Sequence, residues 1–232
     1  MTEELTIEID PSALEAVPIF PLPGTVLLPQ TLVSLHVFEP RYRKMMAYCL
    51  EEHRVMAVAL LHERGEPDAF GRPPIHGMAG LGYVRRSARL PDGRYNIVLE
   101  GVARLDVSRE HPPETPFRRA QGLLIEPDPV TESASTVQSA GHALRALCSR
   151  VFSAPGQTET LEELFRLPPG QLADTVAASA IEDPQERQRV LETVDVQERV
   201  ELVSGALGAL ILGSAARRIR SVRCLPRDPG GG

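Results

Sequence analysis

The spacing of apolar residues changes near the middle of the chain, and this change most constrains the fold. In the first half, apolar residues alternate or form short runs, as in "VPIFPL" (17–22) and "VMAVALL" (55–61). This spacing predicts strands, because successive side chains of a strand point to opposite faces. After residue 132 the apolar residues recur every three or four positions, which predicts helices. The segment "EPDPVTE" (126–132) holds two prolines and three acids, so we expect it to separate the two halves.

The first half is expected to be a small, closed or nearly closed barrel of short strands with one helix. Asp92-Gly93 predicts a tight hairpin turn, and Gly101 predicts a bulge or a sharp corner. In "EPRYRKMMAYCLEE" (39–52) the apolar residues share one face at helical spacing. The predicted strands cover residues 17–22, 31–38, 55–61, 81–90, 94–101, 102–108 and 118–126.

The second half is expected to be an α-helical bundle of about four or five helices that ends in a long helix. The stretch 181–203 marks two helix starts, because Asp183 precedes Pro184 and Asp195 stands three residues before a glutamate. The fold class is therefore α+β. We expect a flexible N-terminal segment (1–14), a barrel (15–129), a helical bundle (130–222) and a disordered tail (223–232).

Composition excludes several classes of protein. A net charge of -6 and a pI near 5.6 argue against a nucleic-acid binder that relies on a positive field. The three cysteines are far apart and form no CxxC pair, so neither a disulfide framework nor a zinc site is predicted. The sequence has no apolar run of about 18 residues and no signal peptide, so we expect no membrane span and a cytoplasmic location.

The motifs of common catalytic sites do not occur. The sequence contains no GxxxxGK[ST], GxGxxG, GxSxG or HExxH pattern, so we expect no enzyme, no cofactor and no catalytic residue. His62 and His76 flank a loop (62–74) that is rich in Gly, Pro and charge, and they could approach each other. Solvated loop histidines are favoured over a metal site, because two histidines without a further ligand rarely suffice.

The candidate binding residues lie near the start of the first helix and in this loop, which we expect to be mobile. Glu39, Arg41 and Arg43 could orient a partner peptide. The alternative, which is favoured, is structural: Glu39 caps the helix and Arg41 pairs with a barrel carboxylate. The methionines of the helix adapt to varied partners or fill the core. The candidates are Glu39, Arg41, Tyr42, Arg43, Met46, His62, Phe70 and His76.

Three stretches resemble one known family, the Lon N-terminal domain, which is also called the LON substrate-binding domain. They are "VPIFPLPGTVLLPQTLVSLHVFEPRYRKM" (17–45), "LPDGRYNIVLEGVARLDV" (90–107) and "LADTVAASAIEDPQERQRVLETVDVQERVELV" (172–203). The resemblance covers roughly residues 15–222. It implies a pseudo-barrel of the PUA-like type followed by a helical bundle, which agrees with the periodicity.

The resemblance also implies a function in recognition rather than proteolysis. Full Lon proteases continue into an ATPase module and a Ser-Lys protease domain, and each of these needs a lysine. The only lysine here is Lys44, in the first predicted helix, and it corresponds to neither. We therefore expect a non-catalytic module that binds unfolded or client polypeptides at exposed apolar segments, as an adaptor or regulator in protein quality control.

Two further functions stay open. Because PUA-like barrels elsewhere bind RNA, an RNA-binding protein is the alternative, although the acidic pI and the scarcity of lysine and aromatic residues weigh against it. An assembly partner is the third, with a Lon-type ATP-dependent protease as its partner. The apolar stripe of the long helix would serve either an intramolecular core or a homo-oligomer, and the core is favoured.

Overall fold

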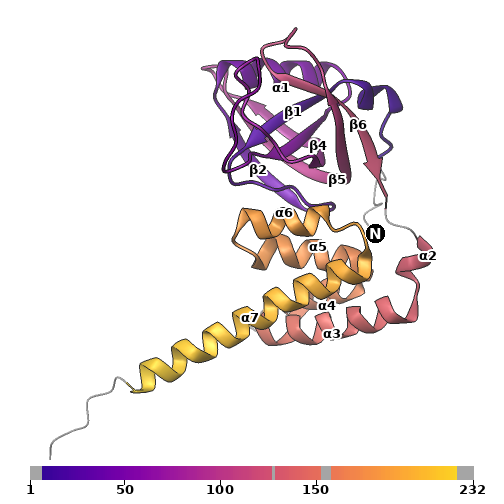
Figure 1. Ribbon diagram of the computed structural model, residues 1–232, viewed down its shortest axis with the longest axis vertical. Coiled ribbons are helices and arrows are strands. Elements are labelled where there is room, and N and C mark those ends of the chain that lie inside the picture. Colours follow the sequence, from indigo (N-terminus) through magenta and orange to yellow (C-terminus); the bar gives the residue numbers. More distant parts are fainter. Residues whose placement is uncertain (1–6, 127–128, 153–157, 224–232) are drawn as a thin grey trace, which may run out of the picture.

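The computed structural model describes residues 7–126, 129–152 and 158–223, which form a β-barrel followed by a bundle of helices (Figure 1). This arrangement confirms the predicted α+β class. The strands are β1 (Val17–Leu22), β2 (Leu32–Val37), β3 (Val55–Leu60), β4 (Met78–Arg89), β5 (Tyr95–Glu110) and β6 (Arg118–Ile125). The helices are the 3-10 helix η1 (Pro11–Glu15), α1 (Pro40–Glu51), α2 (Pro129–Glu132), α3 (Ser135–Val151), α4 (Thr158–Arg166), α5 (Pro169–Ala180), α6 (Pro184–Glu192) and α7 (Val196–Arg223).

The barrel closes because β5 is long enough to pair with three strands. The strand order is β2-β5-β4-β3-β1-β6, and β5 pairs again with β6. Only β1 and β3 run parallel; the other pairs are antiparallel. Closure leaves few free strand edges, and within the described residues β2 pairs on one side only.

The two predicted strands at 94–108 are one continuous strand in the structure. At Gly101 the register with β4 shifts by one residue, which confirms the predicted bulge. A Cβ atom at Gly101 would collide with the carbonyl of Leu28, so glycine lets the preceding loop pass close to β5. The predicted hairpin turn is also present, with Gly93 at φ +82°.

Helix α1 covers one side of the barrel with the face that its spacing predicts. The side chains of Tyr42, Met45, Met46 and Cys49 are buried. They share one core cluster with residues of β4 and β5 such as Val84. Residues 11–15, within the segment that we expected to be flexible, form η1, whose Ala13 is buried. Residues 1–6 of that segment, and 224–232 of the expected tail, lie outside the described residues.

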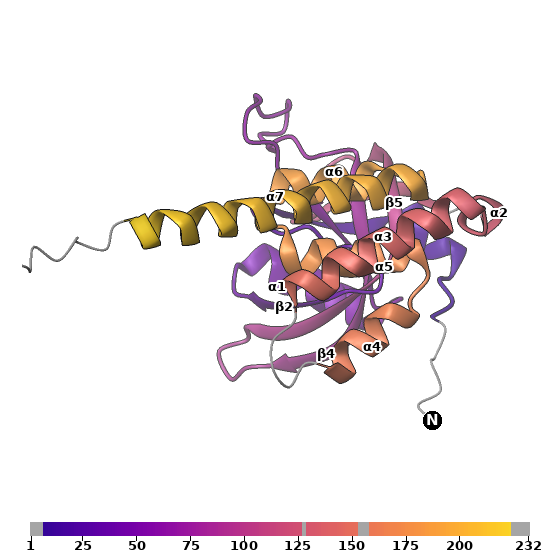
Figure 2. The same cartoon turned by 90° about the horizontal axis from the view of Figure 1, so that it is seen from below.

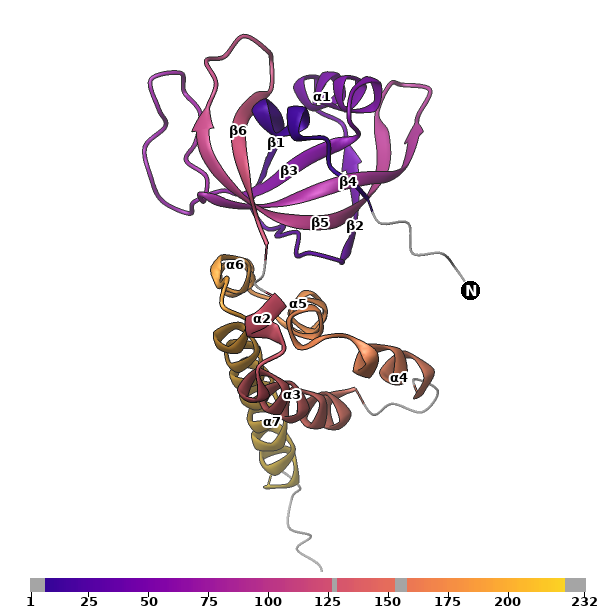
Figure 3. The ribbon, with the colours of Figure 1, turned by 90° about the vertical axis from the view of Figure 1, so that its right-hand side faces the viewer.

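The bundle begins its helices where the sequence marks them. The Asp183 carboxylate accepts a hydrogen bond from the backbone N–H of Gln185 at 3.0 Å, and Asp195 accepts one from Glu198 at 2.9 Å. Helices α5 and α6 lie next to the barrel, with α3 and α7 beyond them (Figures 1 and 3). The helical half is therefore stacked on the barrel through α5 and α6.

Helix α7 is 28 residues long and changes its surroundings along its length. Val196, Val200, Val203 and Leu207 are fully buried, whereas Leu210 and Leu212 are 44% and 73% exposed. The helix extends away from the rest of the molecule (Figure 2). Its apolar stripe thus serves the intramolecular core only as far as Leu207. Among the described residues, every helix is too short or too polar to cross a bilayer.

Three buried charged side chains join the barrel to the bundle. Two Nη atoms of Arg104, on β5, donate to the carboxylate of Asp174, on α5, at 2.6 and 3.1 Å. The Nε atom of Arg199, on α7, lies 3.4 Å from the same carboxylate. Burial lowers the pKa of Arg199, and the Asp174 charge opposes this effect. The triad connects one strand with two helices.

Apolar packing and one amide extend this junction. Val26, Leu28 and Leu60 of the barrel belong to the same core cluster as the buried residues of the bundle. Gln188, on α6, donates from Nε2 to the carbonyl of Met78 at 2.8 Å. Barrel and bundle therefore share one of the core clusters of the described residues, and we expect them to unfold together.

We predict that Asp174→Asn lowers the free energy of unfolding by about 3–5 kcal/mol, because it removes the carboxylate that two buried guanidinium groups share. Urea denaturation followed by circular dichroism measures this change. The matched control is Glu186→Gln, which breaks an exposed pair with Arg189 and should cost less than about 1 kcal/mol. Equal stabilities of the two variants would contradict the prediction.

Candidate functional site

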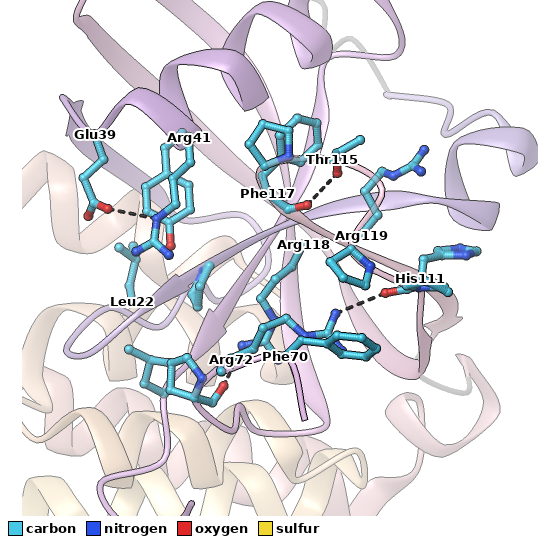
Figure 4. Close-up of a pocket in the computed structure, with 18 of the residues that line it drawn as sticks. Leu22, Glu39, Arg41, Phe70, Arg72, His111, Thr115, Phe117, Arg118 and Arg119 are labelled. Atoms are coloured by element: carbon cyan, nitrogen blue, oxygen red, sulfur yellow. Dashed lines mark hydrogen bonds and ion pairs between the residues drawn. The ribbon is translucent and has the colours of Figure 1, made fainter. Parts of the chain in front are cut away.

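A cavity of about 410 Å³ opens on the surface of the barrel, which is a size typical of ligand sites (Figure 4). Its walls come from the end of β1, the start of α1, the loop 62–74 and the loop between β5 and β6. Side chains that line it include Leu22, Glu39, Arg41, Tyr42, Phe70, Arg72, His111, Thr115, Phe117, Arg118 and Arg119. Four segments that are far apart in the sequence therefore meet around one hollow.

The wall formed by α1 is aromatic and charged. The Tyr42 ring packs on Phe20, with ring centroids 4.6 Å apart, and the Arg41 guanidinium lies 4.5 Å from the centroid of the Tyr42 ring. Arg41 also donates from Nε to the Glu39 carboxylate at 2.9 Å. Burial raises the pKa of Tyr42, so its phenol is neutral. The Arg41 guanidinium is thus the exposed part of this wall, and the Tyr42 ring beneath it is buried.

The loop 62–74 forms a turn around the carboxylate of Asp68. This carboxylate accepts hydrogen bonds from the backbone N–H groups of Phe70 and Arg72, each at 2.9 Å, and from Arg72 Nε at 2.7 Å. These hydrogen bonds hold the pKa of Asp68 below its ordinary value, and the bond from the backbone N–H of Arg72 has the largest effect. The turn presents Phe70 at the cavity with 59% of its surface exposed. The expected mobility of the loop stays a prediction.

Glu110, at the end of β5, ties this loop to the barrel. Arg118 Nε donates to its carboxylate at 2.9 Å, and Arg72 Nη1 lies 3.3 Å from it. Arg118 also donates from Nη1 to the carbonyl of Pro73 at 2.6 Å. The shape of the cavity thus rests on a charged network beneath it.

The structure brings four of the eight candidate residues together at this cavity: Glu39, Arg41, Tyr42 and Phe70. The structural roles expected for Glu39 and Arg41, a helix cap and a pair with a barrel carboxylate, are not observed. The Glu39 side chain makes no capping hydrogen bond, and the partner of Arg41 is Glu39 rather than a barrel carboxylate. Both side chains line the cavity and pair with each other there.

The other candidates lie elsewhere. The Met46 side chain is fully buried in the core beneath α1, so a ligand cannot reach it without unpacking the barrel. Arg43 lies against the Gly93 turn. His62 and His76 approach each other as expected, with their rings stacked at 4.0 Å, and His76 Nδ1 is 2.9 Å from Glu192 on α6. They belong to the junction between barrel and bundle.

A metal centre is not formed at these histidines. Among the residues that the structure describes, no group of three or more His, Cys, Asp or Glu side chains is placed to hold a metal ion. The two described cysteines, Cys49 and Cys148, are buried and unpaired. Burial raises the pKa of these thiols to about 12 and about 11, so the reactive thiolate is scarce at neutral pH.

The sequence reasoning missed the part of the site between β5 and β6. This loop, "HPPETPF" (111–117), supplies His111, Thr115 and Phe117 to the cavity, and Arg118 and Arg119 follow it. The loop contains three prolines and lies between two predicted strands. This pattern is typical of a rigid surface loop and could have pointed to a binding site.

Comparison with known proteins identifies the relatives of this chain. A family model described as the ATP-dependent protease La (LON) substrate-binding domain matches residues 16–208. The chain is 27% identical over 194 residues to Lon protease 2 of Myxococcus xanthus and 30% identical over 197 residues to a Lon protease of Phenylobacterium zucineum. These matches cover 82% and 83% of this chain but only 23% and 24% of the relatives, so the chain spans about a quarter of their length.

Solved structures agree with this result at the level of the fold. The N-terminal domain of the Lon protease from the Mycobacterium avium complex superimposes with a TM-score of 0.63 at 20% identity, covering 84% of this chain and 98% of that domain. A Lon N-terminal domain protein from Xanthomonas campestris gives a TM-score of 0.58 at 20% identity, with coverages of 80% and 95%.

We predict that neither Cys49 nor Cys148 is alkylated by iodoacetamide at a pH of about 8 in the folded protein. A raised pKa means less thiolate at any given pH: with a pKa of about 11, about one Cys148 thiol in a thousand is ionised at that pH. Mass spectrometry of the digested protein measures the modification. The same treatment in urea is the control and should label both residues, whereas labelling in the folded state would refute their burial.

Proposed function

Because this chain belongs to the LON substrate-binding domain family, we propose that it binds exposed or unfolded polypeptide segments, without cutting them, in the cavity beside Tyr42. The observation that supports the proposal is the meeting of four candidate residues from α1 and the loop 62–74 around one hollow. The solvent-exposed ring of Phe70 would then contact an apolar side chain of the bound segment.

The chemistry of the lining suits an extended polypeptide. Six prolines line the cavity, and their fixed backbone angles reduce the entropy that binding would cost. Guanidinium N–H groups of Arg41 and Arg119 can donate to peptide carbonyls, because each of these arginines makes a single hydrogen bond to a carboxylate among the described residues. Apolar contact and hydrogen bonds to the main chain together favour binding with little dependence on sequence.

A non-catalytic role is part of the proposal. The family model that matches this chain describes a substrate-binding domain, and the described thiols have raised pKa values. We propose that the protein acts as an adaptor or regulator in protein quality control, in the cytoplasm, with a Lon-type ATP-dependent protease as its partner. The RNA-binding alternative is not favoured by these relatives.

We predict that Phe70→Ser weakens the binding of a fluorescently labelled, permanently unfolded polypeptide about tenfold in the absence of nucleotide. The physical reason is the loss of an aromatic contact, worth on the order of 1–2 kcal/mol. Fluorescence anisotropy measures the dissociation constant. Phe38→Ser is the matched control, because Phe38 is also 59% exposed but does not line the cavity.

Three results would overturn the proposal. The first is the absence of saturable binding by the unmodified protein. The second is an equal loss of affinity in the two variants, since this would point to general hydrophobicity. The third is cleavage of the labelled polypeptide, which gel electrophoresis of the same samples would detect.

A further inference from the structure

We propose that a basic groove on β2, β5 and β4 is a second binding site, for an acidic segment of an extended polypeptide. The groove measures about 830 Å³ and crosses three neighbouring strands at the end of the barrel where the β4–β5 hairpin turns. Arg54, Arg85 and Arg86 line it, and none of the described residues that line it is Asp or Glu. The site is distinct from the cavity beside Tyr42, with which it shares no lining residue.

A β-bulge gives the groove two adjacent arginines. In the pairing of β4 with β5, Val84 is opposite Leu99 and Arg86 is opposite Val98, so Arg85 is an extra residue. A bulge breaks the alternation of a strand and re-aims its side chains, so two consecutive residues can serve one face. Arg85 pairs with Glu100. Arg86 is exposed and has no carboxylate partner within the part of the chain that the structure describes.

The third arginine is held in an uncommon backbone conformation. Arg54 has a φ of +58°, in the left-handed region that non-glycine residues seldom occupy. Its N–H donates to the carbonyl of Cys49 at 2.7 Å, and its guanidinium Nη2 donates to the carbonyl of Val84 at 2.9 Å. The hydrogen bonds to the Val84 carbonyl therefore fix a cation beside the bulge, and the positive φ belongs to the turn that follows α1.

Polar side chains line the other end of the groove. His36 Nδ1 lies 2.6 Å from Asn96 Oδ1, and Arg94 Nη1 lies 3.2 Å from His36 Nε2. Arg54, Arg85 and Arg86 are the arginines among the described lining residues.

Charge complementarity identifies the occupant. The stretch 85–94, "RRSARLPDGR", contains four arginines and one aspartate in a chain whose net charge is -6. A local positive patch on an acidic protein favours an acidic partner. None of the described residues that line the groove is Phe, Tyr or Trp, whereas single-stranded nucleic acids bind on aromatic stacking platforms.

The strand edges favour an extended partner. β3 pairs with β4 only as far as Tyr83, so the outer half of β4 has a free edge beside the groove. β2 pairs only with β5 within the described residues, so its outer edge is free as well. An extended segment can add main-chain hydrogen bonds at such an edge while its acidic side chains meet the arginines.

A labelled peptide of about ten residues with alternating Glu and Thr tests this site by fluorescence anisotropy with the full chain. We expect saturable binding that weakens as salt is added, because charge pairs are screened. Arg86→Glu should weaken binding about tenfold or more. Arg89→Glu, an equal charge change on the same exposed strand outside the lining, should weaken it less than about threefold. Phe70→Ser should leave the affinity for the acidic peptide unchanged. This result would separate binding in the groove from binding in the cavity beside Tyr42.

The proposal is overturned if the peptide does not saturate, or if the two charge variants lose equal affinity. It is also overturned if a single-stranded oligonucleotide of similar charge binds more tightly than the peptide. Circular dichroism of each variant confirms that the fold is kept. If Arg86→Glu does not fold, Arg86→Ser with Arg89→Ser as its control replaces the pair.

Discussion

The Asp174 carboxylate, placed between two buried guanidinium groups, is the interaction on which the arrangement of the two halves depends. Arg104 belongs to the barrel, whereas Asp174 and Arg199 belong to the bundle, and all three side chains are at most 4% exposed. Compared with apolar packing, a buried ionic cluster adds little net stability, but removing one member is costly. We interpret the triad as the feature that selects one docking position among many that the apolar core would tolerate.

Sequence periodicity and capping residues predicted most of this architecture. Alternation located the barrel strands, and Asp183 and Asp195 located two helix starts, because these signals are local. The triad could not be predicted, since residues 104, 174 and 199 meet only after the chain has folded. The sequence also predicted two strands, 94–101 and 102–108, divided at Gly101. In the structure they form the single strand β5, because its pairing with β4 continues past a bulge at this glycine.

The candidate site shows the same limit. Glu39, Arg41, Tyr42 and Phe70 could be singled out because a helix start and a Gly/Pro-rich loop are readable in the sequence. Met46 lies on the apolar face that the helical spacing predicts, and the packing of α1 on the barrel decides between a binding role and a place in the core. Residues 111–119, which complete the cavity, come from the loop between β5 and β6 and from the start of β6, and their position depends on barrel closure.

The length of β5 has a mechanical consequence. This strand carries Arg104, which holds the bundle, and ends at Glu110, which anchors the cavity wall. A strand in a closed barrel cannot slip by one residue without turning its inward side chains outward. One register of β5 therefore sets both the contact with the bundle and the position of the cavity wall.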